Sequence, residues 1–172
     1  GDRLAAADAV ARHLGGQPSL RQPGYVAGYW AVNGELPLHA VQLRLAPGQV
    51  WCLPVVQDDG GLRFAPWRAG DPLQPSRHGI PEPTLAPEAT LAPEDMQVVL
   101  LPLLGFDAAG GRLGMGGGYY DRSFAFRQGR AAPPLLVGVG FACQELPALV
   151  PEPWDVPLDA VLTERGFQPS GR

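Results

Sequence analysis

Residues 97–122, QVVLLPLLGFDAAGGRLGMGGGYYDR, join a short apolar segment to a glycine-rich loop and then to a segment of helical character. The valines and leucines of Gln97–Leu101 suit a central parallel strand that is buried on both faces. The loop extends over 105–118, and Tyr119–Arg127 is predicted to be a helix. A strand, a glycine-rich loop and a helix in this order are typical of the edge at which open α/β sheets bind ligands.

The rest of the chain also alternates between strand and helix patterns, which predicts an α/β domain with a mainly parallel sheet. Between residues 58 and 93 prolines are too frequent for central strands, so a long ordered loop with a short strand at Leu62–Phe64 is expected. The other predicted helices are Asp2–Leu14 and Leu36–Leu45, and the other predicted strands are Tyr25–Val32, Val50–Val56, Leu135–Val139 and Ala160–Leu162.

Length and composition exclude several classes of protein. A chain of 172 residues is most simply one domain. Its 13 basic residues are all arginines, so there is no lysine for a Schiff base, a lysine nucleophile or a P-loop. The net charge of −4 and the lack of a basic stripe argue against binding to duplex nucleic acid.

Cysteines and apolar runs indicate the compartment. Cys52 and Cys143 both have apolar neighbours, which favours buried free thiols over a disulfide. No apolar run is long enough to span a membrane, and no signal sequence is visible. A cytoplasmic monomer is therefore expected. His13, His39 and His78 lack metal-ligand spacing and are interpreted as structural or exposed.

The loop itself has the properties of a phosphate site. Its glycines allow close approach of backbone N–H groups to an anion, and Arg112 and Arg122 could add charge-assisted contacts. A plain surface loop is the alternative. A Gly-Lys-Ser/Thr motif is absent, and Tyr119 stands where a dinucleotide fingerprint that starts at Gly114 needs its last glycine. A P-loop enzyme and a nicotinamide dehydrogenase are thus disfavoured.

Several motifs, in order along the chain, resemble those of the 5-formyltetrahydrofolate cyclo-ligases, also called methenyltetrahydrofolate synthetases. The resemblance extends from about Arg3 to Glu164. The motifs are Tyr29–Glu35, Leu53-Pro54, Gly79–Pro83, Leu101-Pro102, Gly105–Asp107, Arg112–Arg122, Val137-Gly138, Gln144, Leu146-Pro147, Trp154–Asp159 and Val161–Thr163.

The resemblance implies a reaction and a fold. Family members convert 5-formyltetrahydrofolate and ATP to 5,10-methenyltetrahydrofolate, ADP and phosphate, with magnesium. The fold implied is a three-layer α/β/α arrangement of the NagB/RpiA/CoA-transferase-like type, with a mainly parallel sheet.

The resemblance also implies roles for individual residues. The loop would bind ATP, with Arg112 and Tyr119 catalytic, and would also meet the folate. Trp30 and Glu35 would line the folate pocket, Glu35 by accepting a pair of pterin N–H groups. The ATP contacts implied are Arg112, Gly114, Gly116, Gly117, Gly118, Tyr119 and Tyr120, and the folate contacts in the loop are Met115, Gly116, Gly117, Gly118 and Tyr119.

The implied magnesium ligands are Asp121 and Asp155, since magnesium prefers carboxylate, phosphate and water oxygens. Each has a structural alternative: Asp121 could be a first-turn carboxylate on a helix dipole, and Asp155 a solvated loop residue or cap. Glu35 could equally be a residue at the start of a helix. Tyr29 and Trp30 are neighbours on a strand, so one of them is expected to face the core. Glu82 is expected to be structural or at the pocket rim.

The family's first helix, which carries a lysine and an arginine near the ATP phosphates, has no counterpart before Asp2–Leu14. Weaker ATP binding than in a chain with that helix is the expectation. Two other functions remain open: a non-catalytic folate- or nucleotide-binding paralogue, and a related α/β enzyme acting on a phosphosugar or an acyl-CoA.

Overall fold

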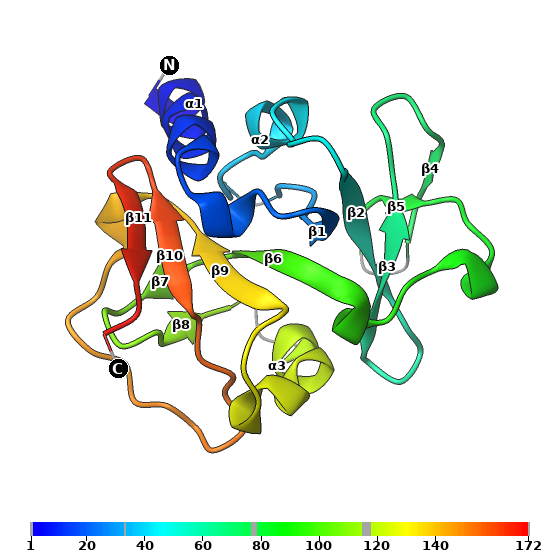
Figure 1. Cartoon of the computed structure of the whole chain (residues 1–172). Coiled ribbons are helices and arrows are strands. Elements are labelled where there is room, and N and C mark those ends of the chain that lie inside the picture. Colours follow the sequence, from blue (N-terminus) through cyan, green and yellow to red (C-terminus); the bar gives the residue numbers. More distant parts are fainter. Residues whose placement is uncertain (1, 33, 77–78, 115–117, 172) are drawn as a thin grey trace.

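A central sheet organises the molecule (Figure 1). The computed structural model describes residues 2–32, 34–76, 79–114 and 118–171, and within them seven strands form this sheet in the order β11-β10-β9-β6-β1-β2-β3. Its strands are β1 (Gly24–Ala27), β2 (Gln49–Val56), β3 (Leu62–Pro66), β6 (Met96–Pro102), β9 (Leu135–Val139), β10 (Ala160–Thr163) and β11 (Gly166–Pro169).

The strand order reverses between β1 and β6. β1, β2, β6, β9 and β10 are parallel, whereas β3 and β11 pair antiparallel at the two edges. From β1 the chain continues to β2 on one side, and from β6 it continues to β9 and β10 on the other. The loops that follow β1 and β6 therefore diverge, which leaves space for a ligand at the carboxyl ends of these strands.

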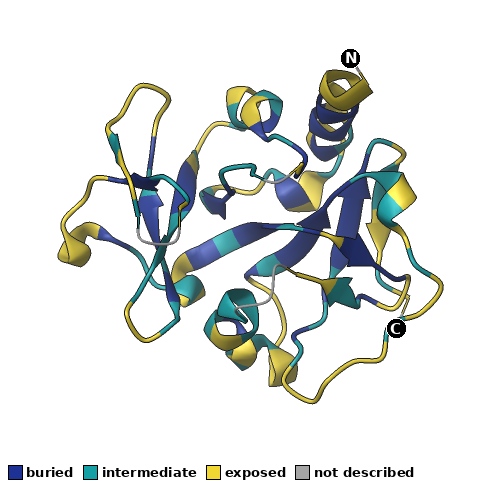
Figure 2. Ribbon diagram, turned by 180° about the vertical axis from the view of Figure 1, so that it is seen from behind, coloured by how far each residue is buried: buried dark blue, intermediate teal, exposed yellow. Residues whose placement is uncertain are grey.

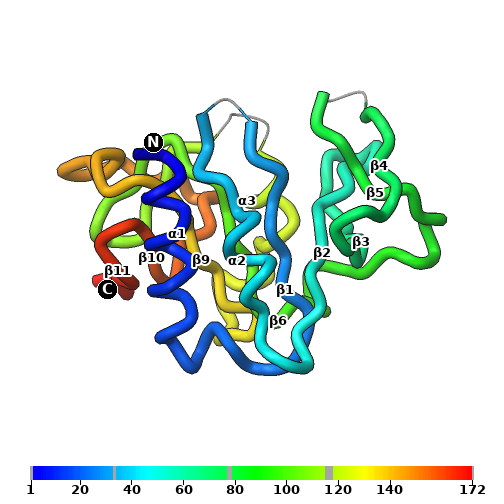
Figure 3. Tube along the Cα trace, turned by 90° about the horizontal axis from the view of Figure 1, so that it is seen from above, coloured from blue at the N-terminus to red at the C-terminus, as the bar shows by residue number. Residues whose placement is uncertain are grey.

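Two small hairpins and several short helices complete the fold. Figure 3 shows the part of the chain with β3, β4 and β5 on one side of the molecule and β10 and β11 on the other. The remaining helices are α1 (Asp2–Gly15), α2 (His39–Leu43) and α3 (Tyr119–Ser123), with the 3-10 helices η1 (Pro18–Leu20), η2 (Pro87–Ala89), η3 (Pro93–Asp95), η4 (Ala125–Gly129) and η5 (Ala142–Gln144). The hairpins pair β4 (Leu73–Gln74) with β5 (Glu82–Pro83) and β7 (Gly105–Phe106) with β8 (Arg112–Leu113).

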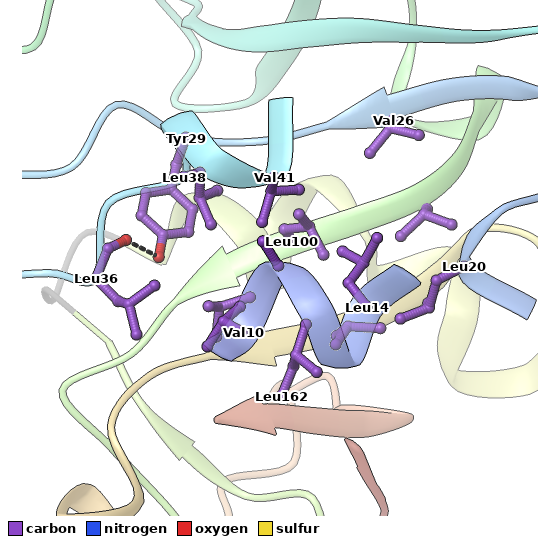
Figure 4. Close-up of a cluster of buried hydrophobic side chains, with 14 of the residues drawn as sticks. Val10, Leu14, Leu20, Val26, Tyr29, Leu36, Leu38, Val41, Leu100 and Leu162 are labelled. Carbon is purple, nitrogen blue, oxygen red and sulfur yellow. Dashed lines mark hydrogen bonds between the residues drawn. The ribbon is translucent and has the colours of Figure 1, made fainter. Parts of the chain in front are cut away.

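Apolar side chains cover both faces of the sheet and produce three layers. On one face Val10 and Leu14 of α1 pack against Leu100 and Leu162 of the sheet, as Figure 4 shows. On the other face Phe124 closes a second cluster. The central strands are accordingly mostly buried, whereas most exposed residues lie in loops and on the outer faces of helices (Figure 2). The predicted α/β/α arrangement with a mainly parallel sheet is confirmed.

Two predicted elements are shorter than their sequence patterns suggested. β1 ends at Ala27 instead of Val32. The next residue, Gly28, lies against the indole of Trp51, where an added Cβ would come within 2.0 Å of a ring carbon. The second helix begins at His39 instead of Leu36. The backbone before it is held differently, since the Leu36 carbonyl accepts a hydrogen bond from the Tyr29 hydroxyl at 2.6 Å.

Other predictions were wrong in detail. The stretch 105–118 begins with the β7–β8 hairpin and is not loop throughout, and the predicted helix Tyr119–Arg127 divides into α3 and η4. β11 was missed, and the short strand at Leu62–Phe64 extends to Pro66 as β3. Both cysteines are free, but only Cys52 is buried, whereas Cys143 is exposed. Burial raises the pKa of the Cys52 thiol to about 12.

No helix within the described part of the chain is both long and apolar enough to cross a membrane.

Candidate active site

A cavity of about 1090 Å³ opens at the carboxyl ends of β1, β2 and β6, where the strand order reverses. Its walls are the segment after β1, the end of β2, the stretches 110–114 and 118–121, and the chain between residues 149 and 157. Predictions for Met115, Gly116 and Gly117 lie outside the described residues. The other predicted site residues all line the cavity: Trp30, Glu35, Arg112, Gly114, Gly118, Tyr119, Tyr120, Asp121 and Asp155.

Arg112 is the one cation among the described residues that line this cavity. Its side chain is only 10% exposed, and its Nη2 lies 3.2 Å from Asp121 Oδ1. Its guanidinium carbon lies 5.8 Å from the centre of the Tyr120 ring. The Arg112 Nε is buried and has no hydrogen-bond partner among the described residues. Because an unpaired buried donor costs about 1–3 kcal/mol, this N–H is suited to an anionic ligand.

Arg122, the second arginine predicted to contact phosphate, is directed elsewhere. Its Nη2 donates to the Gly60 carbonyl at 3.1 Å, and its guanidinium carbon lies 5.4 Å from the centre of the Tyr119 ring. It thereby ties α3 to the β2–β3 turn. Gly118, which precedes α3, has φ +70°, a left-handed conformation that favours glycine. With only five residues, α3 offers a weaker dipole than the predicted nine-residue helix.

Asp121 and Asp155 both line the cavity, and both are partly committed to other contacts. Asp121 Oδ1 accepts from Arg112 and from the Val156 N–H at 2.9 Å, and Asp155 Oδ2 accepts from the Glu152 N–H at 2.8 Å. Among the described residues, the second oxygen of each carboxylate accepts no hydrogen bond. Two carboxylate oxygens suit magnesium, which takes its other ligands from phosphate and water. No group of three or more potential ligands occurs among the described residues. The residues present therefore fit a magnesium ion shared with a ligand.

Glu35 forms the other polar end of the cavity. It is 6% exposed, and its Oε1 accepts the Val32 N–H at 2.9 Å. Burial raises the pKa of Glu35, an effect opposed by this hydrogen bond. A buried carboxylate with one oxygen engaged by backbone can still accept hydrogen bonds from a planar N–H pair.

Two aromatic residues stand beside Glu35. Tyr29 is the one that faces the core: it is 5% exposed, and burial and the nearby Glu35 raise the pKa of its phenol. Trp30 is half-buried and is held edge-on by His39 and Trp67, with ring centroids 6.1 and 5.9 Å away. Both still line the cavity.

Tyr120, on α3, is another aromatic residue of the cavity. Its ring stacks on Phe124 at an interplanar angle of 13°, and burial raises the pKa of its hydroxyl, which therefore stays protonated and can donate.

Asp107 holds two walls of the cavity together, a role that the sequence motif alone did not reveal. Its Oδ1 accepts the N–H groups of Ala109 and Gly111 at 3.1 and 2.7 Å, within the β7–β8 hairpin. Its Oδ2 accepts the Leu149 N–H at 2.8 Å, at the start of the 149–157 segment. Asp107 therefore fixes the hairpin that carries Arg112 relative to the opposite wall.

Replacing Asp107 with alanine is expected to lower the free energy of unfolding by about 2–4 kcal/mol, because buried N–H groups lose their acceptor. Urea denaturation measures this loss. Asp107→Asn keeps an acceptor oxygen and should lose less. Equal stability of the alanine variant and the wild type would show that water replaces the carboxylate without cost.

Two other polar residues, Glu82 and Gln128, hold neighbouring segments together. Glu82 is buried, and its Oε2 accepts the Val56 N–H at 2.9 Å, which joins β5 to β2 as expected of a structural residue. Gln128 of η4 donates to the carbonyls of Pro153 and Asp155. Only the tertiary contacts identify it, because nothing in the local pattern distinguishes this glutamine.

The position of the cavity at the strand-order reversal and its buried arginine define an α/β protein with a site suited to an anionic ligand. Residues 1–164 match the 5-formyltetrahydrofolate cyclo-ligase family. The chain therefore belongs to that family, and it is a ligase of folate metabolism.

Individual relatives agree with this assignment. The chain is 32% identical over 160 residues to 5-formyltetrahydrofolate cyclo-ligase of Haemophilus influenzae, covering 91% of this chain and 84% of the relative. It is 37% identical over 142 residues to the Escherichia coli K12 enzyme of the same name, covering 80% and 76%. The NMR structure of Aquifex aeolicus 5,10-methenyltetrahydrofolate synthetase superposes with a TM-score of 0.78 at 28% identity, covering 96% of this chain and 82% of that one.

Proposed function

We propose that the cavity binds 5-formyltetrahydrofolate and ATP together and converts them to 5,10-methenyltetrahydrofolate, ADP and phosphate. The observation that carries the proposal is the pairing of two opposite polar groups in one cavity. Arg112 offers a buried, unpaired N–H to an anion, and Glu35 offers a buried carboxylate to N–H donors. These are the groups that a triphosphate and a reduced pterin need.

ATP solves a leaving-group problem. The formyl group on nitrogen 5 is an amide, and its oxygen leaves poorly. Transfer of the terminal phosphoryl group to this oxygen breaks the bond to ADP and forms an imidate-like phosphate. Nitrogen 10 then attacks the activated carbon, and phosphate departs as the ring closes. The protein's part in such a reaction is mainly to position the substrates and to neutralise charge.

Each residue in the scheme has a task that its surroundings permit. Arg112 would donate to the transferring phosphoryl group, helped by backbone N–H groups of the glycine-rich loop, including Gly114 and Gly118. The hydroxyls of Tyr119 and Tyr120 would donate to phosphate or formyl oxygen. Glu35 would accept from the pterin, next to the face of Trp30.

Asp121 and Asp155 are the residues that would hold magnesium. When bound, the ion would contact the phosphate oxygens and neutralise part of their charge. Asp155→Asn retains an acceptor for the Glu152 N–H but weakens ion binding, so the magnesium concentration for half-maximal activity should rise roughly tenfold. Magnesium titrations of activity and of AMP-PNP binding check this. Asp8→Asn, exposed on α1, is the control and should leave both titrations unchanged. Unchanged titrations for Asp155→Asn would remove Asp155 from the metal site.

The decisive experiment is to mix the protein with 5-formyltetrahydrofolate, magnesium and ATP and to follow the near-ultraviolet absorbance of the methenyl product. The proposal requires product that depends on ATP and is accompanied by equal amounts of ADP, with none when AMP-PNP replaces ATP. Binding of both substrates without turnover would favour a non-catalytic paralogue. Failure to bind 5-formyltetrahydrofolate would favour an enzyme for a phosphosugar or an acyl-CoA.

We further propose that the protein acts as a cytoplasmic monomer on small molecules, neither nucleic acid nor membrane being a partner. Its free cysteines suit a reducing compartment. Sedimentation of the purified protein tests the monomer.

A further inference from the structure

Trp154 stands apart from the other three tryptophans of the chain. Trp51 and Trp67 are buried and Trp30 is half-buried, whereas Trp154 is 64% exposed and still lines the cavity. An exposed indole at the mouth of a substrate cavity has a large apolar face available for a planar ligand.

The backbone that carries this indole is well held. The side-chain amide of Gln128 donates to the carbonyls of Pro153 and Asp155, at 3.1 and 2.8 Å, and so grips the chain on both sides of Trp154. The turn is closed by two hydrogen bonds between Glu152 and Asp155, at 2.8 and 3.0 Å. The ring is therefore presented from a preorganised turn, which lowers the entropic cost of binding a ligand.

η4, which carries Gln128, is itself anchored. Arg127 donates to the carboxylate of Asp159 through Nη2 and to the Pro134 carbonyl through Nε at 2.9 Å. These contacts fix the 3-10 helix against the start of β9 and the segment before β10. Gln128 therefore holds the turn that carries Trp154 in place against η4.

The turn lies next to the groups assigned to phosphate and away from the pterin end. Asp155 adjoins Trp154, and the next residue, Val156, donates to the carboxylate of Asp121 that contacts Arg112. In the sheet, Glu35 follows β1, whereas the turn belongs to the β9–β10 connection. β6 and its glycine-rich loop lie between them. The Trp154 side is therefore the side of this loop that is free of the proposed pterin contacts.

Charge distinguishes the nucleoside from the folate tail as the partner of Trp154. Glu152 and Asp155 flank the indole at close range in the sequence, and Glu152 also lines the cavity. The negative charge of Glu152, which is not assigned to the metal, would repel the glutamate carboxylates of a folate. A neutral purine with an amino donor meets no such repulsion and stacks well on an aromatic ring.

We propose that Trp154 stacks on the adenine of ATP and is a nucleotide-specificity residue of this enzyme, held in place by Gln128. This inference rests on the proposed binding of the triphosphate by the glycine-rich loop and Arg112. It adds a contact for the base.

The test compares two magnesium-loaded probes, AMP-PNP and inorganic tripolyphosphate, which has the phosphates but no base. Isothermal titration with Trp154→Ala should give about tenfold weaker AMP-PNP binding than the wild type, with tripolyphosphate affinity unchanged. Trp154→Phe keeps an aromatic face and should restore most of the affinity. Leu43→Ala, at an 85% exposed site on α2 outside the cavity, is the matched control and should change neither.

Three results would overturn the proposal: unchanged AMP-PNP affinity in Trp154→Ala, an equal loss of affinity for tripolyphosphate, or a loss of affinity for 5-formyltetrahydrofolate instead. Failure of the phosphate assignment gives a different pattern. In that case the wild type would bind AMP-PNP but not tripolyphosphate, and the comparison of AMP-PNP binding between wild type and Trp154→Ala would still decide the base contact.

Discussion

Replacing Arg112 with alanine is expected to lower kcat/KM for both substrates by roughly 100- to 1,000-fold, the largest effect of any substitution in this cavity. The buried guanidinium is placed to neutralise charge that grows on the transferring phosphoryl group, and such preorganised donors are commonly worth this much. Its removal also leaves the carboxylate of Asp121 facing the phosphates without its partner. Initial rates of methenyl formation, with each substrate varied in turn, measure the loss.

Arg122→Ala is the matched control for this prediction. Arg122 is ten residues away in the sequence, but it is exposed, and its guanidinium contacts the Gly60 carbonyl and the Tyr119 ring. Its loss should cost less than tenfold in kcat/KM. Similar losses in the two variants would mean that general positive charge, and not the buried N–H of Arg112, supports the reaction. Arg112→Lys distinguishes positive charge from donor geometry, since a lysine keeps the charge but cannot reproduce the planar fork of donors.

The strands that hold the site could be predicted, because their composition fits a buried central strand and few other structures. β6 and β9 consist mainly of valine and leucine, and a run of this kind is stable only when it is covered on both faces. α1 could be located from helical spacing, although Leu4, which belongs to that spacing, is 66% exposed. β11 could not be predicted, because Gly166–Pro169 contains no apolar run and is ordered by pairing with β10.

The site was predictable as a motif but not as an arrangement. The glycine-rich loop and its arginine can be recognised in the sequence, and the strand-order reversal explains why Glu35, remote in sequence, lies in the same cavity. Gln128 and Asp107 act through backbone groups of distant segments. Such contacts leave no periodic pattern in the sequence. The different roles of Arg112 and Arg122 likewise depend on tertiary contacts, with Asp121 for Arg112 and with the Gly60 carbonyl for Arg122.

Glu35→Gln is expected to raise the KM for 5-formyltetrahydrofolate by about 10- to 100-fold and the KM for ATP by less than threefold. The amide preserves shape and can still accept the Val32 N–H, but it replaces a charged pair of acceptors with one acceptor and one donor. Glu82→Gln is the matched control, being a buried glutamate in the same cavity that also accepts one backbone N–H. Its KM for folate should stay within about threefold of the wild type.

Glu35→Gln should also change the stability of the fold, because burial raises the pKa of Glu35. Its effect on stability can therefore be compared with its effect on folate binding. A carboxyl group with a raised pKa holds its proton more tightly in the folded state than in the unfolded state. Its contribution to stability is therefore favourable at low pH and is lost as the pH rises through the folded-state pKa. At neutral pH the wild type retains the cost of a buried charge, so Glu35→Gln should be more stable there, by up to about 1 kcal/mol.

Low pH should have opposite effects on stability and on folate binding: it favours the folded state through Glu35 but weakens binding. In the wild type the KM for 5-formyltetrahydrofolate should rise as the pH falls through the raised pKa of Glu35, because the protonated carboxyl loses its charge and an acceptor. In Glu35→Gln this rise should be absent, while urea denaturation at neutral pH shows the gain in stability. A variant that lost stability and kept the pH-dependent KM would assign Glu35 to the scaffold. A variant that gained stability and lost folate affinity would show that the charge of Glu35 serves substrate recognition. The wild-type protein would then keep this charge although it destabilises the fold.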